Sequence, residues 1–215
     1  MTPTEFQAAI AELQPIAAYR DLVRVARRFR KALANPGQTD FLKSMDEVNV
    51  TLVGNATLDF CVDPLVAFLV QRGLIGRVTV GEFDSYVADL LDPNSLILKA
   101  SPDFIAICLD YHAIRASVVS LSETEKSHQM AREQVELWRK LWQTAHDACG
   151  CTILHTNIAT PIERPLGSRD STNAIGRINY CREVNRLLTE ETPSFVTICD
   201  AEHLSGVLGK RTWFN

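Results

Sequence analysis

Residues 48–80 read VNVTLVGNATLDFCVDPLVAFLVQRGLIGRVTV, and this stretch decides the fold. Val48–Val53 is a continuous run rich in β-branched residues, which predicts a core strand that ends at Gly54 and Asn55. Arg77–Val80 predicts a second short strand. A helical segment lies between the two, so the strands are expected to be parallel and joined by a crossover helix.

The connecting helix is predicted from its two ends. Asp63 followed by Pro64 is a favourable N-cap and first-turn pair, and Gly73 is a typical helix stop. These signals place a helix over Leu65–Arg72. The stretch therefore predicts the order strand, loop, helix, strand.

The same alternation continues to the end of the chain. Ser122 and Glu125 form a capping box that predicts the start of a long helix, and the strand over Asp103–Leu109 is expected to be buried on both faces. Because such crossovers are right-handed, we predict a three-layer α/β/α sandwich with a central parallel sheet of about five strands. The other predicted elements are strands over Cys151–His155 and Phe195–Cys199 and helices over Ser122–Ala148 and Ala174–Leu188.

An N-terminal helical extension over residues 1–45 is predicted to precede the α/β domain over residues 46–215. Thr2 and Glu5 indicate a first helix that ends near Leu13, and a second helix is predicted over Ala17–Ala34. The basic residues of the second helix are either a solvated face or a docking surface for an acidic partner. Its apolar stripe is Leu22, Val25, Ala26, Phe29 and Leu33, and its basic residues are Arg20, Arg24, Arg27, Arg28 and Lys31.

Composition limits the possible functions. The 215 residues are 46% hydrophobic and 22% charged, with a formal net charge of -4, so nucleic acid is not an expected partner. The longest apolar runs are too short for a membrane span and the N-terminus lacks the features of a signal peptide, so a cytoplasmic protein is expected. Six cysteines suggest free thiols in a reducing compartment, with Cys61 as a packing residue. The spacing of Cys149 and Cys151 does not indicate a metal site, and no metal or other cofactor is expected.

Candidate functional residues follow the predicted strands, because ligands of open parallel sheets bind beyond the carboxyl ends of the strands. Polar side chains gather at four of these ends, which is also what contact with solvent alone would produce. We predict that Asn55, Thr57, Asp110, Asn157 and His203 converge on one cleft. The four strand ends read Gly54, Asn55, Ala56, Thr57; Asp110, Tyr111, His112; His155, Thr156, Asn157; and Asp200, Ala201, Glu202, His203.

Asp200 and His203 are similar to the Asp-x-x-His pair of SGNH (GDSL-type) hydrolases, in which the aspartate orients a histidine that activates a serine. The place of that serine is taken here by Ala56. Thr57 is one residue late, and Asn157 is a candidate oxyanion-hole donor. Asp200 and His203 are thus candidate catalytic residues without an evident nucleophile, and Asn55, Thr57, Asp110 and Asn157 are candidate binding residues.

A longer pattern resembles the N-terminal SGNH-like domain of FkbH-like proteins, which belong to a haloacid-dehalogenase subfamily. The resemblance covers most of residues 46–215. It includes the LLDPNS segment (90–95), the strand PDFIAICLD (102–110), and Asp200 followed by Gly209, Lys210 and an aromatic pair. The matching runs are VTLVGNATLDFCVDPLVAFLVQRGL (50–74), GEFDSYVADLLDPNSLILKASPDFIAICLD (81–110), ILHTNIATPIERPLG (153–167), INYCREVNRLL (178–188) and VTICDAEHLSGVLGKRTWFN (196–215).

In that family a haloacid-dehalogenase-type domain follows, and the proteins load a glyceryl unit onto an acyl carrier protein in polyketide pathways. The resemblance therefore implies two partners: the phosphopantetheine arm of a carrier protein, and a C-terminal phosphatase-like domain whose D-x-D-x-T motif this sequence lacks. Three functions remain open. They are a binding domain that assists loading without hydrolysis, an active esterase or acyltransferase that uses His203 and Asp200, and a structural or dimerisation domain.

Overall fold

The computed structural model describes residues 8, 18–33, 45–114, 124–174, 176–190 and 192–214. Five strands form one parallel sheet in the order β2-β1-β3-β4-β5. The chain runs outward from β1 in both directions, which is the arrangement of a doubly wound α/β fold. The strands are β1 (Asp46–Gly54), β2 (Leu74–Val80), β3 (Phe104–Cys108), β4 (Thr152–Thr156) and β5 (Val196–Cys199).

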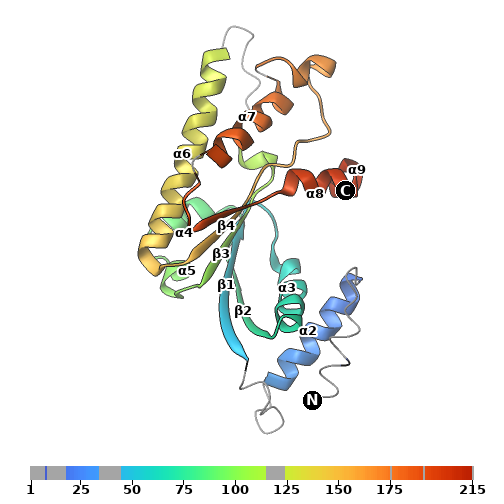
Figure 1. Ribbon diagram of the computed structural model, residues 1–215, viewed down its shortest axis with the longest axis vertical. Helices are drawn as coiled ribbons and strands as arrows, with labels where there is room; N and C mark the ends of the chain where they lie inside the picture. Colours follow the sequence, from blue (N-terminus) through green and yellow to red (C-terminus); the bar gives the residue numbers. More distant parts are fainter. Residues whose placement is uncertain are drawn as a thin grey trace.

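Helices cover the two faces of the sheet unequally (Figure 1). One face carries α4, α5, α6 and α7, whereas the other carries α3, with α2 packed outside it. The C-terminal α8 and α9 extend sideways from the end of β5. The predicted three-layer α/β/α fold is thus confirmed. The helices are α2 (Tyr19–Leu33), α3 (Asp59–Gln71), α4 (Tyr86–Leu91), α5 (Leu96–Lys99), α6 (Thr124–Cys149), α7 (Arg177–Glu190), α8 (Ala201–Leu208) and α9 (Lys210–Trp213), with 3-10 helices η3 (Tyr111–Ala113) and η4 (Gly167–Ser171).

The main core lies between the sheet and helices α4–α7. Ile105, Ile107 and Ile153 of the central strands are fully buried there, against Trp138 and Trp142 of α6. Burying large apolar side chains of this kind is the principal driving force of the fold. The sheet face toward α6 is therefore covered over the central strands, whereas Arg77 and Thr79 of the edge strand β2 are exposed on that face.

The opposite face of β3 is less well covered, which corrects the prediction that this strand is buried on both faces. Phe104, Ala106 and Cys108 alternate with the buried isoleucines and are only half-buried. Successive side chains of a strand point to opposite faces, so these three share the α3 side of the sheet. On that side α3 packs over β1, β2 and the near edge of β3 through Leu65 and Leu69.

Helix α2 follows the predicted apolar stripe. Leu22, Val25, Ala26 and Phe29 are buried against Val66, Ala67 and Val70 of α3. An ion pair of 2.5 Å between Arg30 and Asp63 also connects the two helices. The predicted helix over Ala17–Ala34 is confirmed, and the division of the chain at residue 45 stays a prediction.

Helix α3 corrects the predicted N-cap at Asp63. The helix begins at Asp59, with Leu58 at the N-cap position, and Pro64 lies inside it. The prediction that Asp63 caps the helix was wrong. The helix already begins after Leu58, which is buried, and Asp63 forms an ion pair with Arg30. A proline near the start of a helix removes only one backbone hydrogen bond.

Other boundaries differ modestly from the prediction. The strand β2 starts at Leu74, directly after Gly73 with its positive φ of 78°, and the short helices α4 and α5 were not predicted. The predicted first helix, Thr2 to Leu13, and the capping residue Ser122 lie outside the described residues. Within the described part of the chain, no helix has the length and apolar character that crossing a membrane requires.

Candidate functional site

The carboxyl ends of β1, β3, β4 and β5 form one continuous edge of the sheet, here called the carboxyl edge. Neighbouring strands lie about 4.8 Å apart, so the residues that follow them are close in space. Gly54 ends β1 opposite Cys108 of β3. A Cβ atom on Gly54 would lie 2.0 Å from the Cys108 carbonyl oxygen, so only glycine permits this approach. The close pairing brings Asn55 to the end of β3.

Asn55, Asp110 and His112 form a hydrogen-bonded series at this edge. Asn55 Nδ2 donates to Asp110 Oδ1 at 2.6 Å, and the Asp110 backbone N–H donates to Asn55 Oδ1 at 3.0 Å. Asp110 Oδ2 lies 3.0 Å from Nδ1 of His112, whose side chain is 67% exposed. The carboxylate thus orients an imidazole that remains open to solvent.

Asn157, Asp200 and His203 form a second series with a different geometry. Asp200 Oδ1 accepts from Asn157 Nδ2 at 2.8 Å and from the backbone N–H of His203 at 3.0 Å. These bonds lower the pKa of Asp200, the N–H of His203 contributing most. Asp200 is the N-cap of α8. Among the described hydrogen bonds, Asp200 contacts the backbone of His203 and not its ring, so the hydrolase-like orientation is not formed.

The two series are connected through β4. Thr156 Oγ1 accepts from the Leu109 backbone N–H at 2.9 Å, and the Asn157 backbone N–H donates to the Cys199 carbonyl at 3.0 Å. The polar residues after β1, β3, β4 and β5 therefore belong to one network. The structure joins the predicted residues in pairs: Asn55 contacts Asp110, and Asn157 contacts Asp200, which also accepts from the backbone N–H of His203. Thr57 is exposed and makes no described hydrogen bond to either pair.

A third cluster fixes the loop after β4 against α8. Glu202 accepts from the backbone N–H of Thr160 at 2.6 Å and from its hydroxyl at 2.9 Å. Lys210 Nζ donates to Glu202 at 2.5 Å and to Ser205 Oγ at 2.7 Å. Because Glu202 already accepts three bonds, this cluster positions α8 and α9 beside the carboxyl edge.

Aromatic side chains form one rim of the edge. The ring of Tyr111 lies 4.0 Å from the ring of His112 and 5.7 Å from the ring of Phe214. The guanidinium of Arg177 lies over the Tyr111 ring at 5.7 Å. Residues from η3, α7 and the C-terminal segment therefore meet next to His112, an arrangement that the sequence pattern did not indicate.

His155, which the sequence pattern grouped with the strand ends, belongs to the core. It is fully buried, with ring centroids 4.9 Å from Trp138 and 5.5 Å from Trp142. No described side chain hydrogen-bonds to its ring, and burial lowers its pKa to about 3. A neutral imidazole enclosed by tryptophans is a packing residue and does not reach the carboxyl edge.

The cysteines are free thiols, and Cys61 is exposed, so its predicted role as a buried packing residue was wrong. It lies at the start of α3, and its helical position faces away from α2. Burial raises the pKa of Cys108 to about 11, with Cys61 and Cys199 as charged neighbours in the thiolate state. Within the described residues, no three His, Cys, Asp or Glu side chains are grouped so as to hold a metal ion.

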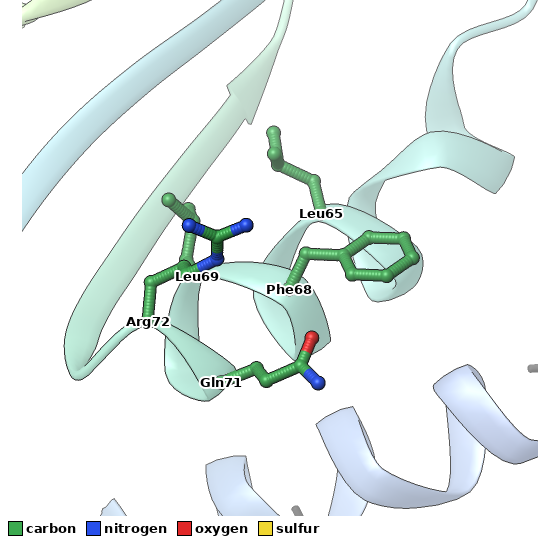
Figure 2. A pocket seen from close by; sticks show the side chains of 5 residues that line it. All are labelled: Leu65, Phe68, Leu69, Gln71 and Arg72. Carbon is green, nitrogen blue, oxygen red and sulfur yellow. The ribbon is translucent and has the colours of Figure 1, made fainter. Parts of the chain in front are cut away.

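A shallow depression of about 600 Å³ lies on α3, apart from the carboxyl edge (Figure 2). Leu65, Phe68, Leu69, Gln71 and Arg72 line it. Leu65, Leu69 and Arg72 follow one another at helical spacing, on the flank of α3 opposite the residues that contact α2. Because this depression has mainly apolar walls from one helix and no oriented polar pair, the hydrogen-bonded carboxyl edge is the stronger candidate for chemistry.

The fold and the carboxyl edge define a doubly wound α/β protein with a polar strand-end site. No family model matches the sequence, and a search of curated proteins gives no match. Among solved structures, the chain is similar to the crystal structure of the N-terminal part of the protein BF1531 from Bacteroides fragilis, which contains a phosphatase domain and is complexed with Mg. The TM-score is 0.73 at 16% identity, over 91% of this chain and 48% of that one. The similarity shows the fold, and this chain spans about half the length of its neighbour.

Proposed function

We propose that this chain is the SGNH-like domain of an FkbH-like protein, and that it binds the pantetheine arm or acyl unit of a carrier protein without catalysing hydrolysis. The strongest support comes from the residues that stand where a hydrolase has its catalytic serine, aspartate and histidine. Ala56 stands where the serine would be, and Asp200 caps α8 through the His203 backbone. An imidazole accelerates acyl transfer only when a nucleophile lies within hydrogen-bond reach.

The chemistry of the carboxyl edge suits a polar, amide-containing ligand. Asn55 and Asn157 each donate one side-chain N–H to a carboxylate, and an amide group has a second N–H to offer. The His112 and His203 side chains are exposed and add hydrogen-bonding groups on both sides of Asn157. Pantetheine presents two amide groups, and a glyceryl unit presents hydroxyls. Both ligands match these donors and acceptors.

The proposed function includes a phosphatase-like partner domain that removes a phosphate. Removing a phosphate through a phosphoaspartyl intermediate requires a D-x-D-x-T motif, which is absent from these 215 residues. The neighbour of known structure contains a phosphatase domain in a chain about twice as long as the matched part. We assign the dephosphorylation step to such a C-terminal haloacid-dehalogenase-type domain and the binding step to this chain.

An esterase or acyltransferase is the second candidate, and one observation favours it. Asp110 holds the ring of His112 in the way that a carboxylate orients a catalytic base, a role that the sequence pattern assigned to Asp200 and His203. The nearest hydroxyl candidate in sequence after β1 is Thr57, which is exposed. An esterase or acyltransferase mechanism requires Thr57 or another hydroxyl to approach the imidazole of His112 or His203.

Calorimetric titration with pantetheine, paired with an assay of p-nitrophenyl ester hydrolysis, separates the two candidates. His112→Ala and His203→Ala should each weaken pantetheine binding by about 1 kcal/mol, the usual worth of one hydrogen bond. Ester hydrolysis should stay at the buffer rate in both variants. The matched control is His128→Ala, which removes a half-exposed histidine paired with Glu183 on the α6 and α7 side. Enzymatic hydrolysis that is lost in either variant, with binding intact, would establish the esterase instead.

A further inference from the structure

The face of the sheet that carries α3 is covered along only part of its width. Right-handed crossovers put α3 on one face and the helices of the three later crossovers on the other. Among the described helices, only α8 and α9 follow β5 and could cover β3, β4 and β5 on the α3 side. Helix α8 projects away from the sheet (Figure 1).

The uncovered strip shows in the exposure of alternating residues. On β4, Ile153 and His155 point toward α6 and are fully buried, whereas Leu154 points to the α3 side and is half-buried. On β5, Thr197 points to the same side and is exposed. Leu154 and Thr197 thus form a strip that no described helix covers, next to Phe104 of β3, which packs against the edge of α3.

The flank of α3 forms one wall of this strip. Phe68 is 42% exposed and lies with Leu65 and Leu69 at the depression in Figure 2. The strip and this flank are here called the open groove. Monomeric proteins rarely leave contiguous apolar surface of this kind uncovered.

Helix α8 presents an apolar stripe that belongs to none of the hydrophobic clusters formed by the described residues. Leu204, Val207 and Leu208 are 52%, 71% and 60% exposed, and their spacing places them on one side of the helix. Ala201 and Ser205, on the other side, are buried. The bonds from the backbone N–H and hydroxyl of Thr160 to Glu202, and from the Glu202 backbone N–H to Asn157, hold α8 in this orientation. The apolar stripe of Leu204, Val207 and Leu208 therefore faces solvent.

We propose that α8 of a second copy of this chain occupies the open groove, so that two copies form a reciprocal dimer. Each copy carries both the groove and the helix that fits it, which is the condition for a two-fold symmetric interface. An eight-residue helix is about 12 Å long and spans the width of three strands. The exposed apolar side chains of α3 and α8 amount to roughly 500 Å² per copy, a large share of the ~800 Å² of a standard interface.

Sedimentation velocity on the purified chain tests the proposal. The wild type should sediment as a dimer at high micromolar concentration and dissociate on dilution. Val207→Glu on α8 and Phe68→Glu on α3 should each raise the dimer dissociation constant by about tenfold or more, because each inserts a charge into the interface. Both side chains are substantially exposed, so neither change disturbs the core. The control is Leu96→Glu, on the opposite side of the sheet, where the side chain is 88% exposed.

Alkylation of Cys61 gives a second readout that needs no variant. Cys61 is exposed in one copy and starts the flank of α3 that borders the open groove. Its alkylation rate should fall severalfold as concentration rises through the dimer range. A wild-type monomer at all concentrations would overturn the proposal, as would dimers that persist in both variants. If the protein is a monomer and a phosphatase-like domain covers the open groove, the surface belongs to that domain. This result would also overturn the dimer proposal.

Discussion

At the scale of single residues, the polar groups of the carboxyl edge first serve the fold. Asp200 satisfies a backbone N–H at the start of α8, and Asn157 bonds both to Asp200 and to the backbone N–H of Glu202. The Asp-x-x-His spacing of a hydrolase is therefore also the spacing of a helix N-cap, in which the side chain bonds three residues ahead. Spacing alone could not separate these roles. The ring contact between Asp110 and His112 has its own two-residue spacing, which the sequence reading did not use.

Replacing Asp200 tests its role as a cap. Asp200→Ala should lower the free energy of unfolding by about 1 kcal/mol, because the N–H of His203 loses its acceptor. Asp200→Ser should recover most of that loss, since serine is also a good N-cap residue. Urea denaturation followed by circular dichroism measures both variants. Equal stability of Asp200→Ala and the wild type would contradict the capping role.

His155 should make stability depend on pH. Its folded pKa of about 3 lies below the ordinary value of 6.5, so the unfolded chain binds a proton that the folded chain does not. Stability should therefore fall as pH drops from 6.5 toward 3, by about 2 to 3 kcal/mol at pH 4.5. Chemical denaturation of the wild type and of His155→Leu at several pH values measures this contribution. The variant should lose less stability over this range.

The exposed His203 provides the control for that experiment. His203→Gln removes an exposed imidazole and is measured in the same way as the control for replacing a histidine. If His155→Leu and the wild type lose stability in parallel between pH 6.5 and 4.5, the buried imidazole is not the cause.

At the scale of elements, periodicity predicted most helices and strands, and tertiary contacts explain the differences. The apolar stripe of α2 predicted both the helix and its buried side. The start of α3 was missed because a buried Leu58 outweighs the local Asp-Pro signal. The prediction that β3 is buried on both faces was wrong, because an apolar strand has the same sequence pattern whether or not a helix covers its second face. The sequence of a strand does not indicate whether a helix will cover its second face.

Phe29 tests whether α2 is an integral part of the fold. It is 1% exposed and packs with Val66 and Val70 of α3, so Phe29→Ala should cost about 3 to 5 kcal/mol. The matched control is Arg28→Ala, one residue away on the exposed side of α2, which should change stability by less than about 0.5 kcal/mol. Thermal unfolding compares the two. Similar melting temperatures would mean that α2 contributes little to the domain.

At the scale of the whole molecule, the topology accounts for both surfaces of interest. Because the strands of the sheet are parallel, the residues that follow them meet at the carboxyl edge, where Asn55 contacts Asp110 and Asn157 contacts Asp200. The pairings join residues 43 to 55 positions apart, so the sequence pattern could name the strand ends but not their partners. The same topology leaves the open groove beside α3.

The central claim, that the carboxyl edge binds a carrier arm and does not hydrolyse it, is tested most directly by titrating two forms of one acyl carrier protein. The form that carries phosphopantetheine should bind this chain about tenfold more tightly than the form without it, and the difference should shrink when His112 is replaced by alanine. The bound arm should remain intact. Equal affinities for the two forms, or cleavage of the acylated arm by the chain, would contradict the account.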